Sequence, residues 1–70
     1  MLRLKKERLR RGWSQAELGR RLRMHPSTLS HLEQGHLKPW PRYRRALERQ
    51  FGMSAEELFR EVEELTSSHD

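Results

Sequence analysis

Helix-starting and helix-ending residues divide this chain into five short segments. The Ser-x-x-Glu pattern of a capping box begins a helix at the residue after the serine, and it occurs at Ser14 and at Ser54. Proline suits the first position of a helix, and glycine suits the position just past its end. The residues of these two kinds are Pro26 and Pro41, which open helices, and Gly12, Gly35 and Gly52, which end them.

The resulting pattern predicts an all-α chain. The expected helices span about 2–11, 15–22, 26–34, 41–51 and 55–65. No stretch alternates apolar and polar residues for long enough to form a strand. Helices this short are marginal alone in water, so they must pack against one another. We therefore expect a compact five-helix bundle over residues 1–66, with residues 67–70 as a frayed tail. The apolar residues expected in its core are Leu4, Leu9, Trp13, Leu18, Leu22, Met24, Leu29, Leu32, Leu37, Trp40, Leu47, Phe51, Met53, Leu58 and Val62.

Charge is distributed unevenly along the chain. Residues 1–50 carry 14 basic and 4 acidic side chains, a net charge of +10, whereas residues 51–70 carry 1 basic and 6 acidic, a net charge of −5. The basic part is suited to a polyanion. Its residues do not form one polar face of a single long amphipathic helix, as binding to a membrane surface would need. Nucleic acid is therefore the expected partner.

Composition excludes several other classes of protein. The chain has no cysteine, so no disulfide framework or thiolate metal site is expected. No apolar run approaches the length of a membrane span, and the basic start does not resemble a signal peptide. The four histidines do not form a metal-binding pattern, and no convergent acid, base or nucleophile is evident. We expect a cytoplasmic protein that is not an enzyme and uses no cofactor or metal.

The segment 15–34 has the pattern of a helix-turn-helix. Two predicted helices are separated by a turn of three residues, 23–25. Two short helices that cross at ~90–120° approach each other closely, which explains Gly19 despite its cost of about 1 kcal/mol relative to alanine. Leu18, Leu22, Met24, Leu29 and Leu32 are placed to hold the pair to the core.

These residues resemble a known family. The pattern Ser14-Gln-Ala-Glu-Leu-Gly, followed by Met24, Ser27-Thr-Leu-Ser-His-Leu-Glu-Gln-Gly35 and Pro39, is similar to the DNA-binding domain of the Cro and phage-repressor (XRE) family. The resemblance covers Leu4 to about Leu58. It implies a lambda-repressor-like fold, a homodimer on a palindromic operator, and a recognition helix at residues 26–34 that lies in the major groove of double-stranded DNA.

The resemblance also implies roles for individual residues. Expected base contacts come from Pro26, Ser27, Ser30 and His31. Expected contacts to the DNA backbone come from Gln15, Thr28, Lys38 and Arg42. Glu33 is expected to pair with Arg8 and so to tie the first helix to the recognition helix. The outward side chains Phe59 and Leu65 of the fifth helix are the candidates for a dimer interface.

The chain departs from the family pattern at four positions. Arg23 replaces the usual glycine of the turn, which costs about 1 kcal/mol if the residue is left-handed. His25 replaces the usual serine or threonine cap of the recognition helix and is a poorer cap. Trp13 and Trp40 replace a leucine and a small polar residue. These departures affect the contacts of the recognition helix more than the fold.

Two functions are consistent with these features. The first is a sequence-specific transcriptional regulator, a repressor, of a bacterium or phage, associated with the nucleoid. The alternative is a protein-interaction module, such as an antitoxin or adaptor, that meets a protein partner through its acidic C-terminal helix. The net charge of +10 on residues 1–50 favours the first, although an antitoxin can bind both DNA and a protein.

Overall fold

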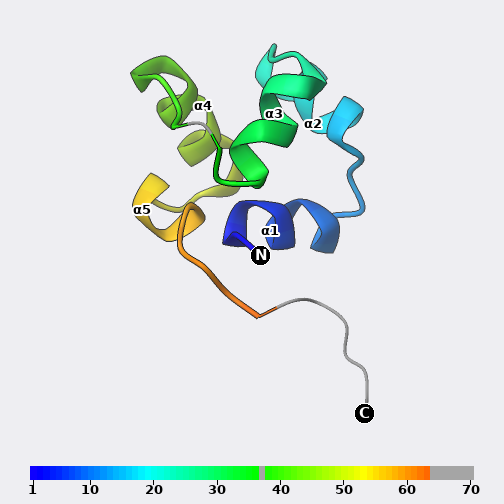
Figure 1. Ribbon diagram of the computed structural model, residues 1–70. Helices are drawn as coiled ribbons and strands as arrows, with labels where there is room; N and C mark the ends of the chain where they lie inside the picture. The colour runs from blue at the N-terminus through cyan, green and yellow to red at the C-terminus, as the bar shows by residue number, and fades with distance from the viewer. Residues whose placement is uncertain (37, 64–70) are drawn as a thin grey trace.

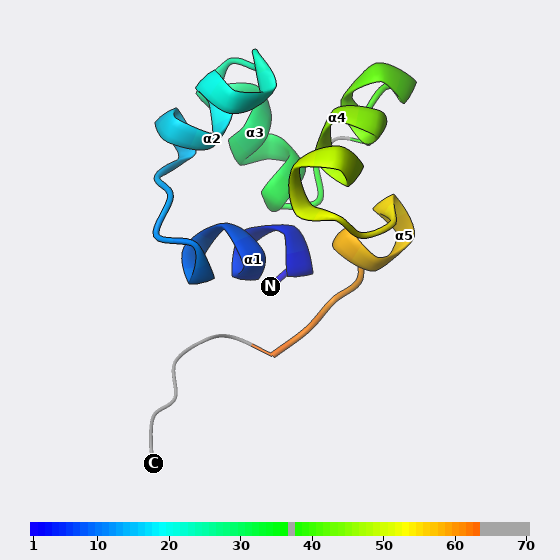
Figure 2. The ribbon, with the colours of Figure 1, turned by 180° about the vertical axis from the view of Figure 1, so that it is seen from behind.

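Five helices make up the part of the chain that the computed structural model describes, residues 1–36 and 38–63. They are α1 (Arg3–Arg10), α2 (Gln15–Leu22), α3 (Pro26–Glu33), α4 (Pro41–Phe51) and α5 (Ala55–Leu58). In both views α3 lies between α2 and α4, and α1 and α5 lie at the other end of the molecule (Figure 1, Figure 2). No strand is present in the described part, where the only pairing is one isolated bridge. The prediction of an all-α, five-helix domain is confirmed.

The helix starts follow from local hydrogen bonds. Ser14 Oγ accepts a hydrogen bond from the backbone N–H of Glu17 at 3.0 Å, and Ser54 Oγ accepts one from Glu57 at 3.1 Å. Each bond satisfies one of the backbone donors that the first turn of a helix leaves without a partner. Both serines of the capping boxes therefore act as expected, and α2 has the predicted bounds.

Leucine side chains form most of the core. Six of them are fully buried: Leu4, Leu18, Leu29, Leu32, Leu47 and Leu58. The expectation for two other residues is wrong, because Leu9 is 40% exposed and Trp40 is 63% exposed. The inward face of α1 is occupied by Glu7 and Arg8, so Leu9 turns toward solvent. Leu37 lies outside the described residues.

The fifth helix is shorter than predicted. It ends at Leu58 instead of residue 65, although the sequence keeps an apolar pattern beyond that point. The backbone that follows pairs with the N-terminus: Arg3 N donates to Arg60 O at 2.9 Å, and Val62 N donates to Met1 O at 2.8 Å. These bonds use backbone groups that a continued helix would need. Residues 64–70, which include Leu65 and the expected tail, lie outside the described residues.

The turn between α2 and α3 explains two unusual residues. A Cβ atom on Gly19 would lie 2.5 Å from the carbonyl oxygen of Met24, whose own N–H donates to Gly19 O at 2.8 Å. Gly19 is therefore required because the turn folds back onto α2. Arg23 adopts φ 55° and ψ 47°, which is the left-handed region, and it has the only positive φ among the described residues other than glycine.

We predict that Arg23→Gly stabilises the domain by about 1 kcal/mol, because glycine adopts the left-handed conformation without strain. Arg45, which is exposed within α4, gives a matched control. Arg45→Gly should cost about 1 kcal/mol, since glycine is a poor helix former. Thermal denaturation followed by circular dichroism measures both changes. A loss of stability in both variants would contradict the prediction.

Candidate nucleic-acid interface

The outward face of α3 carries the predicted base-reading residues. Leu29 and Leu32 are fully buried, which leaves Pro26, Ser27 and His31 exposed on the opposite side of the helix. Ser30 is half-buried and accepts a hydrogen bond from Gln34 Nε2 at 3.3 Å. All four side chains come from one helix, so they can meet one partner surface together.

His25 caps α3 through its imidazole ring. Nδ1 accepts a hydrogen bond from the backbone N–H of Ser27 at 3.1 Å, and it lies 2.8 Å from Ser27 Oγ. This histidine is therefore a working cap, although the sequence indicates a poor one. Ser27, the second residue of α3, is thus held by the residue that precedes the helix.

A second group of side chains lies where α4 begins. Thr28 of α3 shares a shallow pocket of about 100 Å³ with Lys38, Trp40 and Tyr43. The ring of Trp40 stacks on Tyr43 with centroids 5.7 Å apart, and the Arg42 guanidinium lies 5.1 Å from the Tyr43 centroid. The expected backbone-contacting residues of this region, Thr28, Lys38 and Arg42, thus lie beside the stacked pair of an exposed Trp40 and a half-buried Tyr43.

Trp40 was missed as a surface residue by reasoning from the sequence. It is the N-cap of α4, with Pro39 before it and Pro41 after it. Two prolines restrict the backbone on both sides of the tryptophan. The observable signal was therefore this Pro-Trp-Pro pattern, which holds the indole at the start of the helix.

Gln15 has a partner inside the protein. Its Nε2 donates to Glu33 Oε1 at 3.1 Å, at the edge of a buried ion pair. Arg8 Nε donates to Glu33 Oε2 at 2.6 Å and Arg8 Nη2 donates to Glu33 Oε1 at 3.1 Å, so the expected pair is present and bidentate. Arg8 Nη1 also donates to the carbonyl of Trp13 at 2.7 Å. The pair and its partners join α1, the start of α2 and the end of α3.

Many of the basic side chains are neutralised within the fold. Burial alone would raise the pKa of Glu7, but hydrogen bonds from Arg11 and Arg3 outweigh it and hold that pKa below its usual value. A hydrogen bond from Arg20 likewise lowers the pKa of Glu17. Within the described part of the chain, the basic side chains with no carboxylate within 4.0 Å are Lys5, Lys6, Arg23, Lys38, Arg42, Arg44, Arg45 and Arg49. Five of these eight lie in the loop before α4 and in α4 itself.

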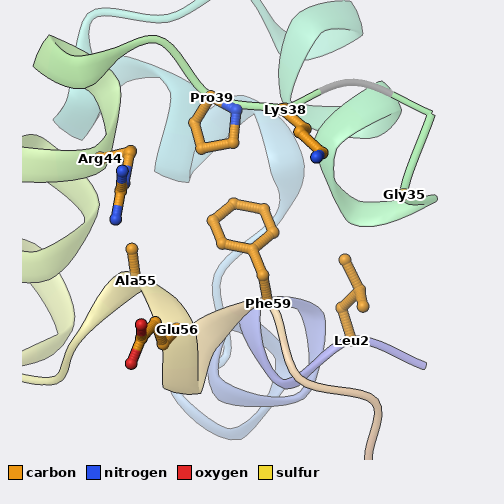
Figure 3. A pocket seen from close by; sticks show the side chains of 8 residues that line it. All are labelled: Leu2, Gly35, Lys38, Pro39, Arg44, Ala55, Glu56 and Phe59. Atoms are coloured by element: carbon orange, nitrogen blue, oxygen red, sulfur yellow. The ribbon is translucent and has the colours of Figure 1, made fainter.

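An apolar groove lies between α5 and the loop before α4. It measures about 590 Å³ and is lined by Leu2, Gly35, Lys38, Pro39, Arg44, Ala55, Glu56 and Phe59. Figure 3 shows the ring of Phe59 pointing from the end of α5 toward Lys38 and Pro39. Phe59, expected to be outward-facing, is thus half-buried at the centre of this groove.

Neither a membrane-spanning helix nor a group of three potential metal ligands is found in the described residues. No helix there combines the length and the apolar character needed to cross a bilayer. No group of three or more His, Cys, Asp or Glu side chains is placed to hold a metal ion there.

Comparison with known protein families identifies the class of this domain. The model of a family described as a helix-turn-helix domain matches residues 2–62. This match confirms the resemblance to the Cro-type class of helix-turn-helix domains that the sequence indicated. No curated protein and no solved structure matches the chain.

We predict that Glu33→Ala destabilises the domain by about 3 kcal/mol, because it leaves the Arg8 guanidinium buried without its counter-ion. The side chains of Arg8 and Glu33 are only 7% and 2% exposed. Glu56→Ala removes an exposed carboxylate and should change stability by less than about 0.5 kcal/mol. Chemical denaturation gives both values.

A double variant separates loss of the pair from loss of folding. Arg8→Met with Glu33→Leu removes both charges, so it should recover most of the stability lost in Glu33→Ala. If Glu33→Ala were as mild as Glu56→Ala, the pair would not hold the helices together.

Proposed function

This chain belongs to the helix-turn-helix domain family, and on that premise we propose that it is a sequence-specific regulator of transcription that binds double-stranded DNA. In this proposal it acts as a repressor in the cytoplasm of a bacterium or phage-infected cell, on nucleoid DNA, without catalysis. The helix α3 enters the major groove, whose width suits a single helix.

One observation carries the proposal. The helix α3, whose exposed face carries Ser27 and His31, lines a pocket through Thr28 together with Lys38 and Tyr43. The Arg42 guanidinium lies 5.1 Å from the Tyr43 ring centroid, and neither Lys38 nor Arg42 has a carboxylate partner among the described residues. A duplex groove combines base edges with an anionic strand beside them, which is the complement of this arrangement. Thr28 is half-buried and belongs both to α3 and to that pocket.

The proposed roles follow from position. Pro26, Ser27, Ser30 and His31 contact bases, with Pro26 providing an apolar contact for a thymine methyl group. Thr28, Lys38 and Arg42 contact the sugar–phosphate backbone. Gln15 uses one N–H of its amide to reach Glu33, which holds the side chain so that its second N–H is available to a phosphate.

We further propose that the protein binds a palindromic operator as a homodimer. One short helix reads only ~4–5 base pairs, which is too few to specify a site in a genome. The groove around Phe59 is the proposed interface, and its occupant is a second copy of this chain. Its rim carries Arg44 as well as Glu56, so two copies related by a twofold axis can pair opposite charges across it.

The alternative of a protein-interaction module draws less support. The feature that favours a protein partner is the acidic C-terminal region. Two of its carboxylates are already paired: Arg3 and Arg60 pair with Glu57, and the N-terminal ammonium pairs with Glu61 at 2.7 Å. Charge engaged inside the fold contributes little to a partner surface.

Selection of bound sites from random duplex DNA tests the proposal. We expect an inverted repeat whose half-sites are about one helical turn apart. Affinity should fall with salt, with a slope of roughly −0.9 per phosphate contacted and about four to six phosphates contacted by each protomer. Enrichment of no site, or binding that ignores salt, would refute the proposal.

Substitutions of the base-contacting and of the backbone-contacting side chains should weaken DNA binding in different ways. His31→Ala should lose about 1–3 kcal/mol of preference at particular base pairs, whereas Lys38→Ala and Arg42→Ala should weaken binding to all sequences alike and reduce the salt slope by about one unit each. Binding of each variant to the selected operator, to single-base variants and to unrelated duplex gives the comparison. The same uniform loss in His31→Ala and Arg42→Ala would show that α3 is placed wrongly.

A further inference from the structure

The cap of α3 selects one tautomer of the His25 ring. A backbone N–H can only donate, so the Nδ1 atom that faces Ser27 N at 3.1 Å must accept. A neutral imidazole has one N–H and one acceptor nitrogen, so the proton of His25 is on Nε2. The tautomer of His25 thus follows from its contact with the Ser27 backbone N–H, because that group can only be the donor.

The same nitrogen also fixes the direction of the Ser27 hydroxyl. Ser27 Oγ lies 2.8 Å from Nδ1, which carries no hydrogen in this tautomer. The hydroxyl must therefore donate to Nδ1, and its single hydrogen is used within the protein. What Ser27 can offer to a partner is the two lone pairs of Oγ, which only accept.

We propose that His25 makes Ser27 an acceptor-only reader of the major groove, which selects an exocyclic amino group, adenine N6 or cytosine N4, on the strand it contacts. This inference rests on the proposed function and names the base chemistry that one residue of the interface recognises. Guanine and thymine present acceptors at the corresponding edge, so they face the Ser27 oxygen without a hydrogen between them. His25, which is placed before the helix, is a specificity-determining residue that acts through Ser27.

The other polar readers are not restricted in this way. Ser30 Oγ accepts a hydrogen bond from Gln34 Nε2, so its own hydrogen stays available to donate. His31 makes no hydrogen bond through its ring to another described residue, so its tautomer can follow the base it meets. Ser30 therefore provides an internal comparison, because it is a serine on the same helix whose hydroxyl can still donate a hydrogen bond to a base.

The first experiment uses the wild-type chain and altered DNA. Bound sites are first selected from random duplex with the wild-type chain and with Ser27→Ala. The operator position that loses its base preference in Ser27→Ala is the one that Ser27 reads. We expect adenine or cytosine there. Replacing that base with an analogue that lacks the amino group, purine for adenine or 2-pyrimidinone for cytosine, should weaken wild-type binding by about two- to tenfold.

The same replacement should have no further effect on Ser27→Ala, because the accepting oxygen is gone. If the selected base is guanine or thymine, or if the wild-type chain does not sense removal of the amino group, the inference is overturned. If the wild-type chain selects no site at all, both the proposed function and this inference are refuted.

The second experiment tests the part played by His25. In His25→Ala the Ser27 hydroxyl is free to rotate, so guanine or thymine should become tolerated at that position, while other positions keep their preference. Ser54→Ala, which removes the cap of α5 instead of that of α3, is the matched control and should leave the preference at the Ser27 position unchanged. Circular dichroism shows whether each variant is folded. A folded His25→Ala that keeps the wild-type preference would overturn the assignment of His25.

Discussion

The buried ion pair between Arg8 and Glu33 sets the orientation of the helix that the proposed function uses. Taking two charges out of water is costly, and the bidentate geometry, the carbonyl of Trp13 and the amide of Gln15 offset that cost. Replacing such a pair with well-packed apolar residues is often neutral or stabilising, whereas removing one partner leaves an uncompensated buried charge. Since Glu33 is the last residue of α3, the pair ties that end of the helix to α1.

Internal pairing also decides where the positive charge of the surface lies. Carboxylates on α1 and α2 hold several arginines in internal pairs, with Glu7 alone contacting three of them. The cations left without such partners in the described residues are concentrated around the start of α4 and along it. The net charge of the sequence therefore does not show where the surface attracts a polyanion, because the fold pairs the arginines of α1 and α2 with carboxylates and leaves those of α4 without described carboxylate partners.

Much of the fold was predictable because helix boundaries depend on nearby residues. The capping boxes at Ser14 and Ser54 and the prolines at 26 and 41 act within one turn, so the bounds of α2 and α4 agree with the prediction. The proposed interface was predictable to the same extent: the burial of Leu29 and Leu32 follows from helical spacing, and it leaves Ser27 and His31 exposed.

The sequence by itself determined the helix starts, the turn and the face of α3, since these follow from helical spacing and from contacts between residues at most five apart. Tertiary structure decided where α5 ends, because its continuation pairs with residues about 60 positions earlier. It also decided that Gln15 joins the Glu33 carboxylate and that Trp40 stacks outside the core. These features depend on which residues distant in the sequence form the same backbone hydrogen bond or fill the same buried space. The spacing of residues along the chain does not predict such long-range contacts.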